Sequence, residues 1–325
     1  WDDGYGNRDT FDSIENITGS DYNDVLGGLN GSSTINGGGG NDLIFGMSGD
    51  DTIDGGAGVD TINGGAGSDT VSYASSTSGI NAELWRGHSW DDGYGNRDTF
   101  DSIENITGSD YNDVLGGING SSTINGGGGN DLIFGMSGND TIYGGTGSDT
   151  INGGSGNDVI YSGNGDDTIN GSNGDDTIIN NGSGTMTLDG GSGTDIYHLD
   201  ASNFTTSIEN FSVFIDMSTG YSGGVNNGTR LETRKDAISN FETIEYTGTY
   251  NVEIIGDTSS NTLSGSTGND TIDGGAGVDT INGGAGSDTV SYASSTSGIN
   301  AELWRGHSWD DGYGNRDTFD SIENI

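Results

Sequence analysis

Hydrophobic residues recur along much of this chain at intervals of nine residues. The sequence GGAGVDTINGGAGSDTV at 55 to 71 holds two near-copies of one nine-residue unit, each with glycines, an aspartate and an apolar residue at fixed positions. The unit reads G-G-x-G-x-D-x-U-x, in which U is apolar, and its positions are numbered one to nine. Such an interval fits neither the 3.6-residue period of a helix nor the alternation of a long strand. It predicts a chain that turns back on itself repeatedly.

The units are in phase over three blocks, residues 19 to 72, 108 to 179 and 256 to 291, and one more unit follows an irregular stretch at 180 to 189. Position eight is Leu26, Ile35, Ile44, Ile53, Ile62, Val71, Leu115, Ile124, Ile133, Ile142, Ile151, Ile160, Ile169, Ile178, Tyr197, Leu263, Ile272, Ile281 and Val290. These 19 units cover roughly half of the chain. So many copies in phase argue against a glycine-rich, low-complexity linker that never folds.

The local sequence predicts short strands. The triplet around position eight, typically Thr-Ile-Asn, is β-prone and lies between turn residues, so we expect a three-residue strand. The glycine half of the unit permits positive φ angles and leaves backbone carbonyl groups unobstructed. Stacked units would place position eight in a narrow core and the position-six aspartates in columns along the outside. The predicted fold class is all-β, a parallel β-solenoid whose blocks are joined by short β-rich linkers.

Composition alone points away from a folded protein. The 325 residues include 65 glycines, only 28% are hydrophobic, and the formal net charge is -42. Chains of this kind are normally disordered, because they bury too little apolar surface to offset the lost backbone entropy. Cysteine is absent, which excludes disulfides and thiolate-bound zinc as stabilising elements. Another interaction must hold the chain together.

The aspartate columns indicate that interaction. Carboxylates stacked at the strand spacing of about 4.8 Å repel one another unless a cation lies between them. Carboxylate and backbone carbonyl oxygens form a hard ligand set, which suits Ca²⁺ with its 6 to 8 flexible oxygen contacts better than zinc or copper. We therefore expect each unit to supply part of a metal site that it shares with a neighbouring unit.

The repeat closely resembles that of the RTX (repeats-in-toxin) family. The resemblance implies a parallel β-roll with two nonapeptides per turn, in which Ca²⁺ is held between turns by the position-six aspartate and carbonyl groups of the glycine half. The predicted metal ligands are Asp42, Asp51, Asp60, Asp69, Asp131, Asp140, Asp149, Asp158, Asp167, Asp176, Asp195, Asp270, Asp279 and Asp288.

Five units depart from the pattern. Asp24 and Asp113 are ranked below the other ligands, because they lie in the glycine-poor sequence GSDYNDVLG at the ends of their blocks. Position six is serine at Ser33 and Ser122 and asparagine at Asn261, so sites there should be weak or missing.

A longer repeat overlies the short one. Residues 1 to 49 recur at 90 to 138 with one change, and residues 49 to 106 recur at 268 to 325 with one change. The resulting period of 308 residues predicts a segment of a tandem array. The predicted organisation is a linker end at 1–18, roll I at 19–72, a linker at 73–107, roll II at 108–198, an insert at 199–255, roll III at 256–291 and a linker at 292–325.

The two similar linkers, 73–107 and 292–325, are called the aromatic linkers below. We interpret each as strands that cap one roll and lead into the next. Two alternatives stay open: a sugar or protein contact made by Trp85, His88, Trp90, Tyr94 and Arg97, or one further Ca²⁺ bound by Asp91, Asp92 and Asp98. In the insert, the basic residues Arg230, Arg234 and Lys235 are expected to pair with neighbouring acids.

The sequence does not favour catalysis. No H-E-x-x-H, G-x-S-x-G or phosphate-binding G-x-x-x-x-G-K-[ST] motif occurs. A Ca²⁺-filled column would also keep its carboxylates ionised, which is unsuitable for a general acid. The acidic surface repels nucleic acid, and no segment predicts membrane insertion.

Three functions are consistent with these features. The first is a non-catalytic Ca²⁺-binding structural repeat of an extracellular filament, surface layer or giant adhesin, with neighbouring copies as partners. The second is a Ca²⁺-dependent accessory region of a larger secreted RTX enzyme or toxin. The third is a carbohydrate-binding module that contacts cell-surface or matrix glycans through the linker aromatics. The 308-residue period favours the first.

The expected mechanism couples folding to secretion. The resemblance implies export from a bacterium by a one-step (type I) system, after which extracellular Ca²⁺ folds the chain. Extracellular modules bind Ca²⁺ with a Kd of about 10⁻⁴ to 10⁻³ M, and the contributions of many sites add. Filling roughly 14 to 16 sites would bring the net charge from -42 to about -14 to -10.

Overall fold

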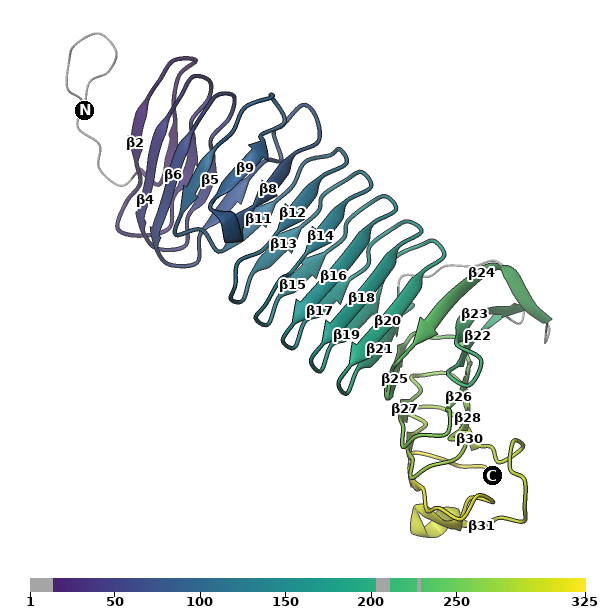
Figure 1. Ribbon diagram of the computed structural model, residues 1–325. Helices are drawn as coiled ribbons and strands as arrows, with labels where there is room; N and C mark the ends of the chain where they lie inside the picture. The colour runs from purple at the N-terminus through teal and green to yellow at the C-terminus, as the bar shows by residue number, and fades with distance from the viewer. Residues whose placement is uncertain (1–13, 203–210, 227–228) are drawn as a thin grey trace. The chain divides into compact units, whose positions relative to one another are not determined.

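The computed structural model describes residues 14–202, 211–226 and 229–325 (Figure 1). Most of the predicted linker end at 1–18 therefore lies outside the described residues. The chain divides into two compact units, residues 1–118 and 119–325. Each unit is described by itself.

Most strands of the first unit have three residues. Its elements are β1 Asn16–Thr18, β2 Val25–Gly27, β3 Thr34–Asn36, β4 Leu43–Ser48, β5 Thr52–Asp54, β6 Thr61–Ala66, β7 Thr70–Ser72, β8 Asn81–Glu83, the 3₁₀ turn η1 Leu84–Arg86, β9 His88–Asp91, β10 Thr99–Asp101, β11 Asn105–Thr107 and β12 Val114–Gly116. Alternate strands join two parallel sheets, β1-β3-β5-β7-β11 and β2-β4-β6-β10.

The second unit continues the same construction with longer strands in its middle. Its elements are β13 Thr123–Asn125, β14 Leu132–Phe134, β15 Thr141–Tyr143, β16 Thr150–Ser155, β17 Val159–Tyr161, β18 Thr168–Asn173, β19 Thr177–Asn180, β20 Thr187–Ser192, β21 Ile196–Asp200, β22 Phe211–Asp216, β23 Tyr221–Asn226, β24 Thr229–Ser239, β25 Thr243–Thr247, β26 Val252–Ile255, β27 Thr262–Ser264, β28 Thr271–Asp273, β29 Thr280–Asn282, β30 Thr289–Val290, β31 Asn300–Glu302, η2 Leu303–Arg305, β32 His307–Asp310 and β33 Thr318–Asp320.

The strand register shows that one turn holds two nonapeptides. Ile35 in β3 lies beside Ile53 in β5, and Ile142 in β15 lies beside Ile160 in β17, so each residue is paired with its equivalent 18 positions later. Successive nonapeptides therefore alternate between two facing parallel sheets. This arrangement confirms the predicted all-β parallel solenoid.

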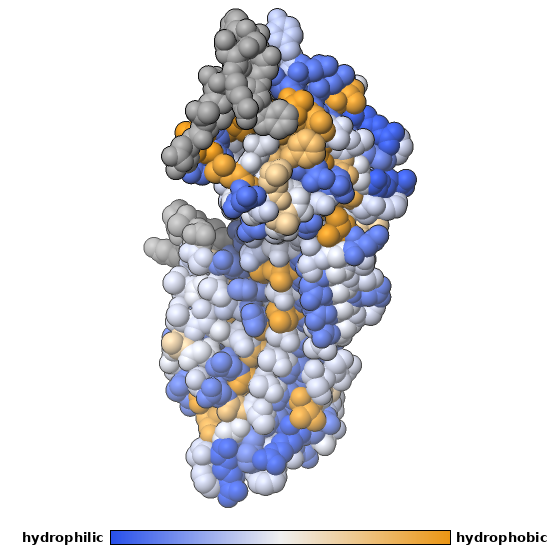
Figure 2. All heavy atoms as spheres, turned by 90° about the vertical axis from the view of Figure 1, so that its left-hand side faces the viewer, coloured by the Kyte–Doolittle hydropathy of each residue, from blue (hydrophilic) through white to orange (hydrophobic). Residues whose placement is uncertain are grey.

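The core is a single row of position-eight side chains from each sheet. Most of these side chains have no exposed surface at all, as at Ile53 and Ile160, and the residues on either side of them in the strand are partly or fully exposed. The core is thus only about two side chains deep, and on the face shown in Figure 2 hydrophobic surface is confined to patches among polar and pale surface. The structure reconciles a hydrophobic content of 28% with a continuous core.

A second series of side chains holds successive turns together at position five. The oxygen of an exposed asparagine, aspartate or serine accepts a hydrogen bond from the backbone N–H of the equivalent residue in the following turn. For example, Asn41 Oδ1 accepts from Val59, and Asn139 Oδ1 accepts from Asn157. Asn, Asp and Ser occupy position five in most units, so this ladder was visible in the sequence but was not predicted.

The aromatic linkers remain part of the solenoid. In the first of them, β8 and β9 form an antiparallel hairpin, after which β10 pairs with β6 and β11 pairs with β7 in parallel. The linker therefore adds strands to both sheets in addition to the hairpin. In the second unit, β31, β32 and β33 repeat this construction beside β29.

The insert at 199–255 is also joined to the solenoid. Strands β22, β23 and β24 form an antiparallel sheet whose outer members pair in parallel with β26 and β20. The side chains of Arg230, Arg234 and Lys235 lie outside the described residues, so their expected pairing with acids stays a prediction.

The one-row core predicts a large cost for a single truncation. Ile151→Ala should lower the free energy of unfolding by about 2–5 kcal/mol, because Ile151 is 1% exposed and its neighbours cannot collapse into the space. Denaturant unfolding in saturating Ca²⁺ measures this change.

Thr150→Ala is the matched control, since Thr150 is the exposed neighbour in the same strand. Its cost should stay below about 1 kcal/mol. Equal costs for the two variants would contradict the one-row core.

Candidate metal sites

The position-six aspartates form continuous buried columns, which we call the carboxylate ladder. Asp60 is typical: its Oδ1 accepts a hydrogen bond of 2.8 Å from the backbone N–H of Asp42, its equivalent in the preceding turn. Asp42, in turn, accepts from Asp24 at 2.8 Å. The expectation that these aspartates line the outside was wrong. Most are 0–3% exposed, because the glycine half of the unit folds over them.

The same contact recurs along both sheets. Predicted ligands that accept a backbone N–H from the preceding turn through Oδ1 are Asp42, Asp51, Asp60, Asp69, Asp140, Asp149, Asp158, Asp167, Asp176, Asp195, Asp270, Asp279, Asp288 and Asp113. Asp131 donates its own N–H to Asp149 Oδ1 and so belongs to the same ladder. Asp24 donates to Asp42 and is only half-buried.

The second carboxylate oxygen of most ladder residues is buried and has no hydrogen-bond partner. This holds for Oδ2 of Asp42, Asp51, Asp60, Asp69, Asp140, Asp149, Asp158, Asp167, Asp176, Asp195, Asp279 and Asp288. A buried carboxylate oxygen without a donor carries a large desolvation cost. Twelve such oxygens in regular columns indicate a missing positive partner rather than isolated defects.

Glycine at position one leaves space beside eleven of these oxygens, and Ser162 holds this position in the unit of Asp167. A side chain at Gly37 would collide with Asp42 Oδ2 and with the carbonyl oxygen of Gly55 in the following turn. Gly46 stands in the same relation to Asp51 Oδ2 and the Gly64 carbonyl oxygen. A carboxylate oxygen and a carbonyl oxygen therefore line the same small space in consecutive turns.

The donor set fits Ca²⁺. Among residues 14–202, 211–226 and 229–325, no three Asp, Glu, His or Cys side chains converge on one point, so a site cannot be built from side chains alone. Carboxylate oxygens combined with backbone carbonyl oxygens are, however, ordinary ligands of Ca²⁺ and poor ligands of zinc or copper. The residues that would hold the ion are the ladder aspartates and the glycine carbonyl groups beside them.

Comparison with known proteins agrees with this geometry. A family model, the RTX calcium-binding nonapeptide repeat, matches residues 18–52, 36–71, 107–142, 116–151, 143–178 and 255–290. The chain is an RTX-repeat protein. RTX repeats are structural calcium-binding repeats, generally non-catalytic, and are typical of secreted bacterial proteins. No curated protein matches the chain.

The three units without a position-six aspartate still donate a backbone N–H to the RTX ladder residue of the following turn. Ser33 Oγ accepts the backbone N–H of Leu29, and Asn261 Oδ1 accepts that of Asp257. Ser33 and Ser122 still donate their own N–H groups to Asp51 and Asp140. These units therefore preserve stacking while lacking the carboxylate, and weak or missing sites there stay a prediction.

Sequence reasoning did not place in the ladder six acidic residues that extend it, although it named Asp98 as a candidate ligand of a separate Ca²⁺. Asp98 and Glu104 in the first linker accept the N–H groups of Asp60 and Asp69. The others are Asp236, Glu242, Asp317 and Glu323, which accept from Met186, Asp195, Asp279 and Asp288. The signal was an acid two residues before an apolar strand residue, as in DTF and ENI, but the linkers break the nine-residue spacing.

The acidic loop of the first linker is held by its own backbone. Asp92 Oδ1 accepts the N–H groups of Tyr94 and Asn96, and Asp91 Oδ1 accepts those of Gly93 and Gly95. These carboxylates thus serve the turn itself. A further Ca²⁺ at Asp91, Asp92 and Asp98 stays a prediction without added support from these contacts.

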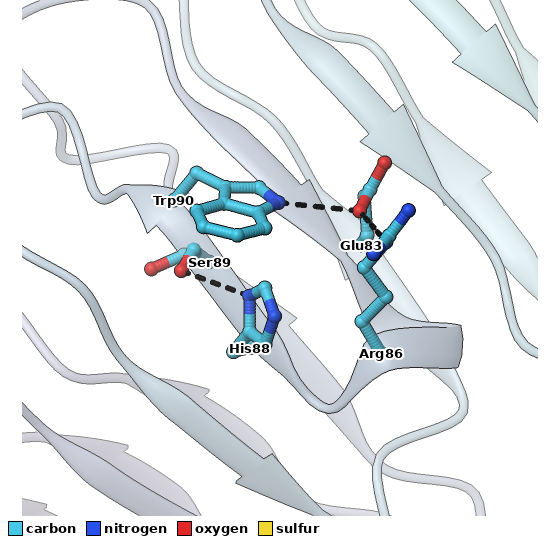
Figure 3. A network of polar contacts seen from close by, with 5 residues as sticks. All are labelled: Glu83, Arg86, His88, Ser89 and Trp90. Atoms are coloured by element: carbon cyan, nitrogen blue, oxygen red, sulfur yellow. Dashed lines mark hydrogen bonds and ion pairs between the residues drawn. The ribbon is translucent and has the colours of Figure 1, made fainter.

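Aromatic residues of the linker lie on η1 and β9, where Trp85 and Trp90 are exposed, and Figure 3 shows His88 and Trp90 beside Glu83 and Arg86. Trp90 Nε1 donates to Glu83 Oε2 at 3.3 Å, Glu83 pairs with Arg86 at 2.5 Å, and His88 packs edge-on against Trp90. The Arg86 guanidinium lies 4.1 Å from the Trp85 ring centroid, and that of Arg97 lies 4.6 Å from the Trp90 centroid. The second linker repeats both stacks at Trp304 and Trp309.

Burial raises the pKa of several ladder carboxyls. Desolvation brings the pKa of Asp60, Asp140, Asp149 and Asp158 to about 6, and that of Asp167, Asp176 and Asp279 to about 7, above the ordinary 3.8. Backbone hydrogen bonds oppose this shift but do not cancel it. Without a cation, the folded ladder therefore binds protons at a pH where the unfolded chain has released them.

These shifts predict the pH dependence of the metal-free chain. Its stability should be greatest below about pH 4 and should fall as the pH rises from about 4 to about 7, because the folded state holds more protons over that window. Circular dichroism in metal-depleted buffers from pH 4 to 8 measures the change. Conversely, Ca²⁺ affinity should rise over the same window with release of protons, which calorimetry in two buffers of different ionisation enthalpy detects. If the stability of the metal-free chain instead increased with pH, the raised pKa of these carboxyl groups would be contradicted.

Proposed function

We propose that this segment is a non-catalytic Ca²⁺-binding structural repeat of an extracellular filament, surface layer or giant adhesin. It folds and becomes rigid when Ca²⁺ binds after secretion. The observation that carries the proposal is the series of buried ladder carboxylates, most of which have one oxygen hydrogen-bonded to the preceding turn and the other without a donor.

The energetics support a requirement for the ion. At neutral pH, ionised carboxylates stacked turn on turn repel one another in a poorly solvated column. A core of one side chain per nonapeptide offers little apolar burial to offset that repulsion. When bound, Ca²⁺ supplies positive charge and oxygen coordination beside Oδ2 and the position-one carbonyl groups. Ladder and core together then stabilise the folded chain.

The long repeat supports a role in an array. Residues 1 to 49 and 90 to 138 differ at one position, and so do residues 49 to 106 and 268 to 325. Near-identical copies are typical of a long protein that presents the same surface many times, and neighbouring copies would be its partners. Among the described residues, no helix is long and apolar enough to cross a membrane. Export by a one-step secretion system, in which the chain stays open until it meets extracellular Ca²⁺, belongs to the same proposal.

The first test is a Ca²⁺ titration followed by far-UV circular dichroism at pH 7.5. We expect a steep coil-to-β transition in the range of about 0.1–1 mM Ca²⁺, because extracellular calcium modules bind in that range and the sites share turns. EGTA should reverse it. Mg²⁺ is the control and should not substitute, since it demands a regular octahedral site and dehydrates reluctantly. A chain that is already folded in EGTA would refute calcium-coupled folding.

Carbohydrate contact through the aromatic linkers is a second candidate function. The observation that favours it is the exposure of Trp85, Trp90 and Tyr94, which are 37%, 50% and 36% exposed beside hydrogen-bonding Glu83 and Arg86. Exposed aromatic and arginine side chains that are already ordered lose little entropy on binding.

The double variant Trp90→Ala, Trp309→Ala tests this candidate. Retention on immobilised alginate, dextran or chitin oligosaccharides should fall at least about tenfold, because each linker loses its central ring. Tyr22→Ala is the matched control, since Tyr22 is 79% exposed but lies outside the linkers. Unchanged retention of the double variant, or none by the wild type, would exclude glycan contact through these tryptophans.

A further inference from the structure

The ladder carboxylates fall into two groups according to what their second oxygen contacts. In the first group Oδ2 has no donor, as described above. In the second group a donor from the protein already occupies it. We infer that only the first group binds Ca²⁺, and that each calcium array is bounded by metal-free carboxylates at its two ends. This inference rests on the proposed function, because it assigns which positions of the ladder take the ion.

The backbone at position two separates the groups. Where this residue has a positive φ, Oδ2 of the aspartate four residues later has no donor, and the N–H of Gly56, for example, donates to Asp54 Oδ1 instead. The residues concerned are Gly38, Met47, Gly56, Gly65, Met136, Gly145, Gly154, Gly163, Ser172, Gly191, Gly275 and Gly284. Met47, Met136 and Ser172 adopt this conformation although it is unfavourable for a residue with a Cβ. The conformation, rather than glycine itself, marks a carboxylate that lacks a donor.

Where position two lacks a positive φ, its N–H turns onto the carboxylate. Ser20 N–H donates to Asp24 Oδ2 at 2.6 Å, and Ser109 N–H donates to Asp113 Oδ2 at 2.6 Å. Ser266 N–H donates to Asp270 Oδ2 at 3.1 Å. None of these serines has a positive φ. The donor supplies within one unit the hydrogen bond that other units lack.

In the aromatic linkers, a tyrosine hydroxyl takes the place of the ion. Tyr73, which is 2% exposed, donates its hydroxyl to Asp98 Oδ2 at 2.9 Å, while Asp98 Oδ1 accepts from Asp60. The second linker repeats this contact between Tyr292 and Asp317 at 3.0 Å. Both oxygens of each carboxylate are thereby satisfied, and a phenol ring fills the space beside them.

The insert achieves the same result with different residues. Asp236 Oδ2 accepts from Asn180 Nδ2 at 2.9 Å and from Ser222 Oγ at 3.2 Å, and its Oδ1 accepts from Met186. Three unrelated local sequences thus supply a hydrogen-bond donor from the protein to the second oxygen of a ladder carboxylate. Such recurrence indicates a function for the internal donor and not an accident of one turn.

The internally satisfied carboxylates occupy corresponding places in the sequence. Asp24, Asp113 and Asp270 are the first ladder aspartates of rolls I, II and III, and Asp98, Asp236 and Asp317 follow the last regular units of the same rolls. The predicted ligand Asp270 therefore joins Asp24 and Asp113 as a metal-free position. At both ends of each roll, a donor from the protein therefore stands where the interior units leave Oδ2 without one.

Paired Asp→Asn variants test the assignment. Asp60 and Asp98 are adjacent in one ladder, and Asp288 and Asp270 are adjacent in another. Bound Ca²⁺ per folded chain is counted by equilibrium dialysis with elemental analysis. Asp60→Asn and Asp288→Asn should each lose about one ion, whereas Asp98→Asn and Asp270→Asn should lose none, although all four remove the same charge. Far-UV circular dichroism in Ca²⁺ verifies that the compared chains are folded.

The possible outcomes separate the two proposals. Loss of an ion from folded Asp98→Asn or Asp270→Asn would overturn the assignment while leaving calcium binding intact. No loss from Asp60→Asn and Asp288→Asn would instead overturn calcium binding by the ladder. If a variant at Asp98 does not fold, the Asp270 and Asp288 pair decides: an unchanged ion count in Asp270→Asn supports the assignment, and a lower count overturns it.

A substitution at Ser266 tests the backbone conformation directly. Ser266→Gly should raise the ion count by about one, because glycine adopts a positive φ at little cost and releases Asp270 Oδ2. Ser266→Ala is the matched control, since it keeps the N–H on the carboxylate and should leave the count unchanged. Equal numbers of bound Ca²⁺ in the two variants would refute the inference that the backbone conformation at position two controls calcium binding at Asp270.

Discussion

The fold depends on burying carboxylates beside one another. Each ladder aspartate uses one oxygen to fix the preceding turn through a backbone N–H, as Asp60 does with Asp42, and this contact needs the side chain inside. The same burial strips water from the second oxygen and stacks like charges along the column. Everything else in the nonapeptide serves this arrangement. Glycine at position one makes room beside the oxygen, and the position-eight side chain closes the turn from the other side.

The solenoid therefore has unusual sources of stability for a protein of its size. A row of single isoleucines such as Ile53 and Ile160 supplies a continuous but thin core, and the position-five ladder adds side-chain hydrogen bonds on the outer surface. Position-six side chains accept hydrogen bonds from backbone N–H groups of the preceding turn, and position-five side chains accept them from the following turn. Each turn is thus held from both directions by side chains of its neighbours, so rigidity comes from polar contacts more than from apolar volume.

Much of this architecture could be read from the sequence because it is periodic. The nine-residue spacing of residues such as Ile44 and Asp42 was sufficient for the fold class, the core and the ladder positions. Burial of the aspartates was not predicted, because hydropathy assigns Asp to the surface and the closure of the glycine half depends on backbone conformation. Asp98 and Glu104 were missed since the linker shifts their spacing. The contact between Tyr73 and Asp98 joins residues from different turns, which no local pattern reveals.

The repetition that makes the chain readable also creates a problem of register. Because each turn presents the same isoleucine, aspartate and strand triplet, a slip of 18 residues would bury equivalent side chains and form equivalent hydrogen bonds. The regular blocks alone hardly distinguish these alternatives. The Tyr73–Asp98 pair does, because a phenol fits only where the tyrosine and the linker hairpin meet. The linkers thus act as landmarks that select one alignment among many of nearly equal energy.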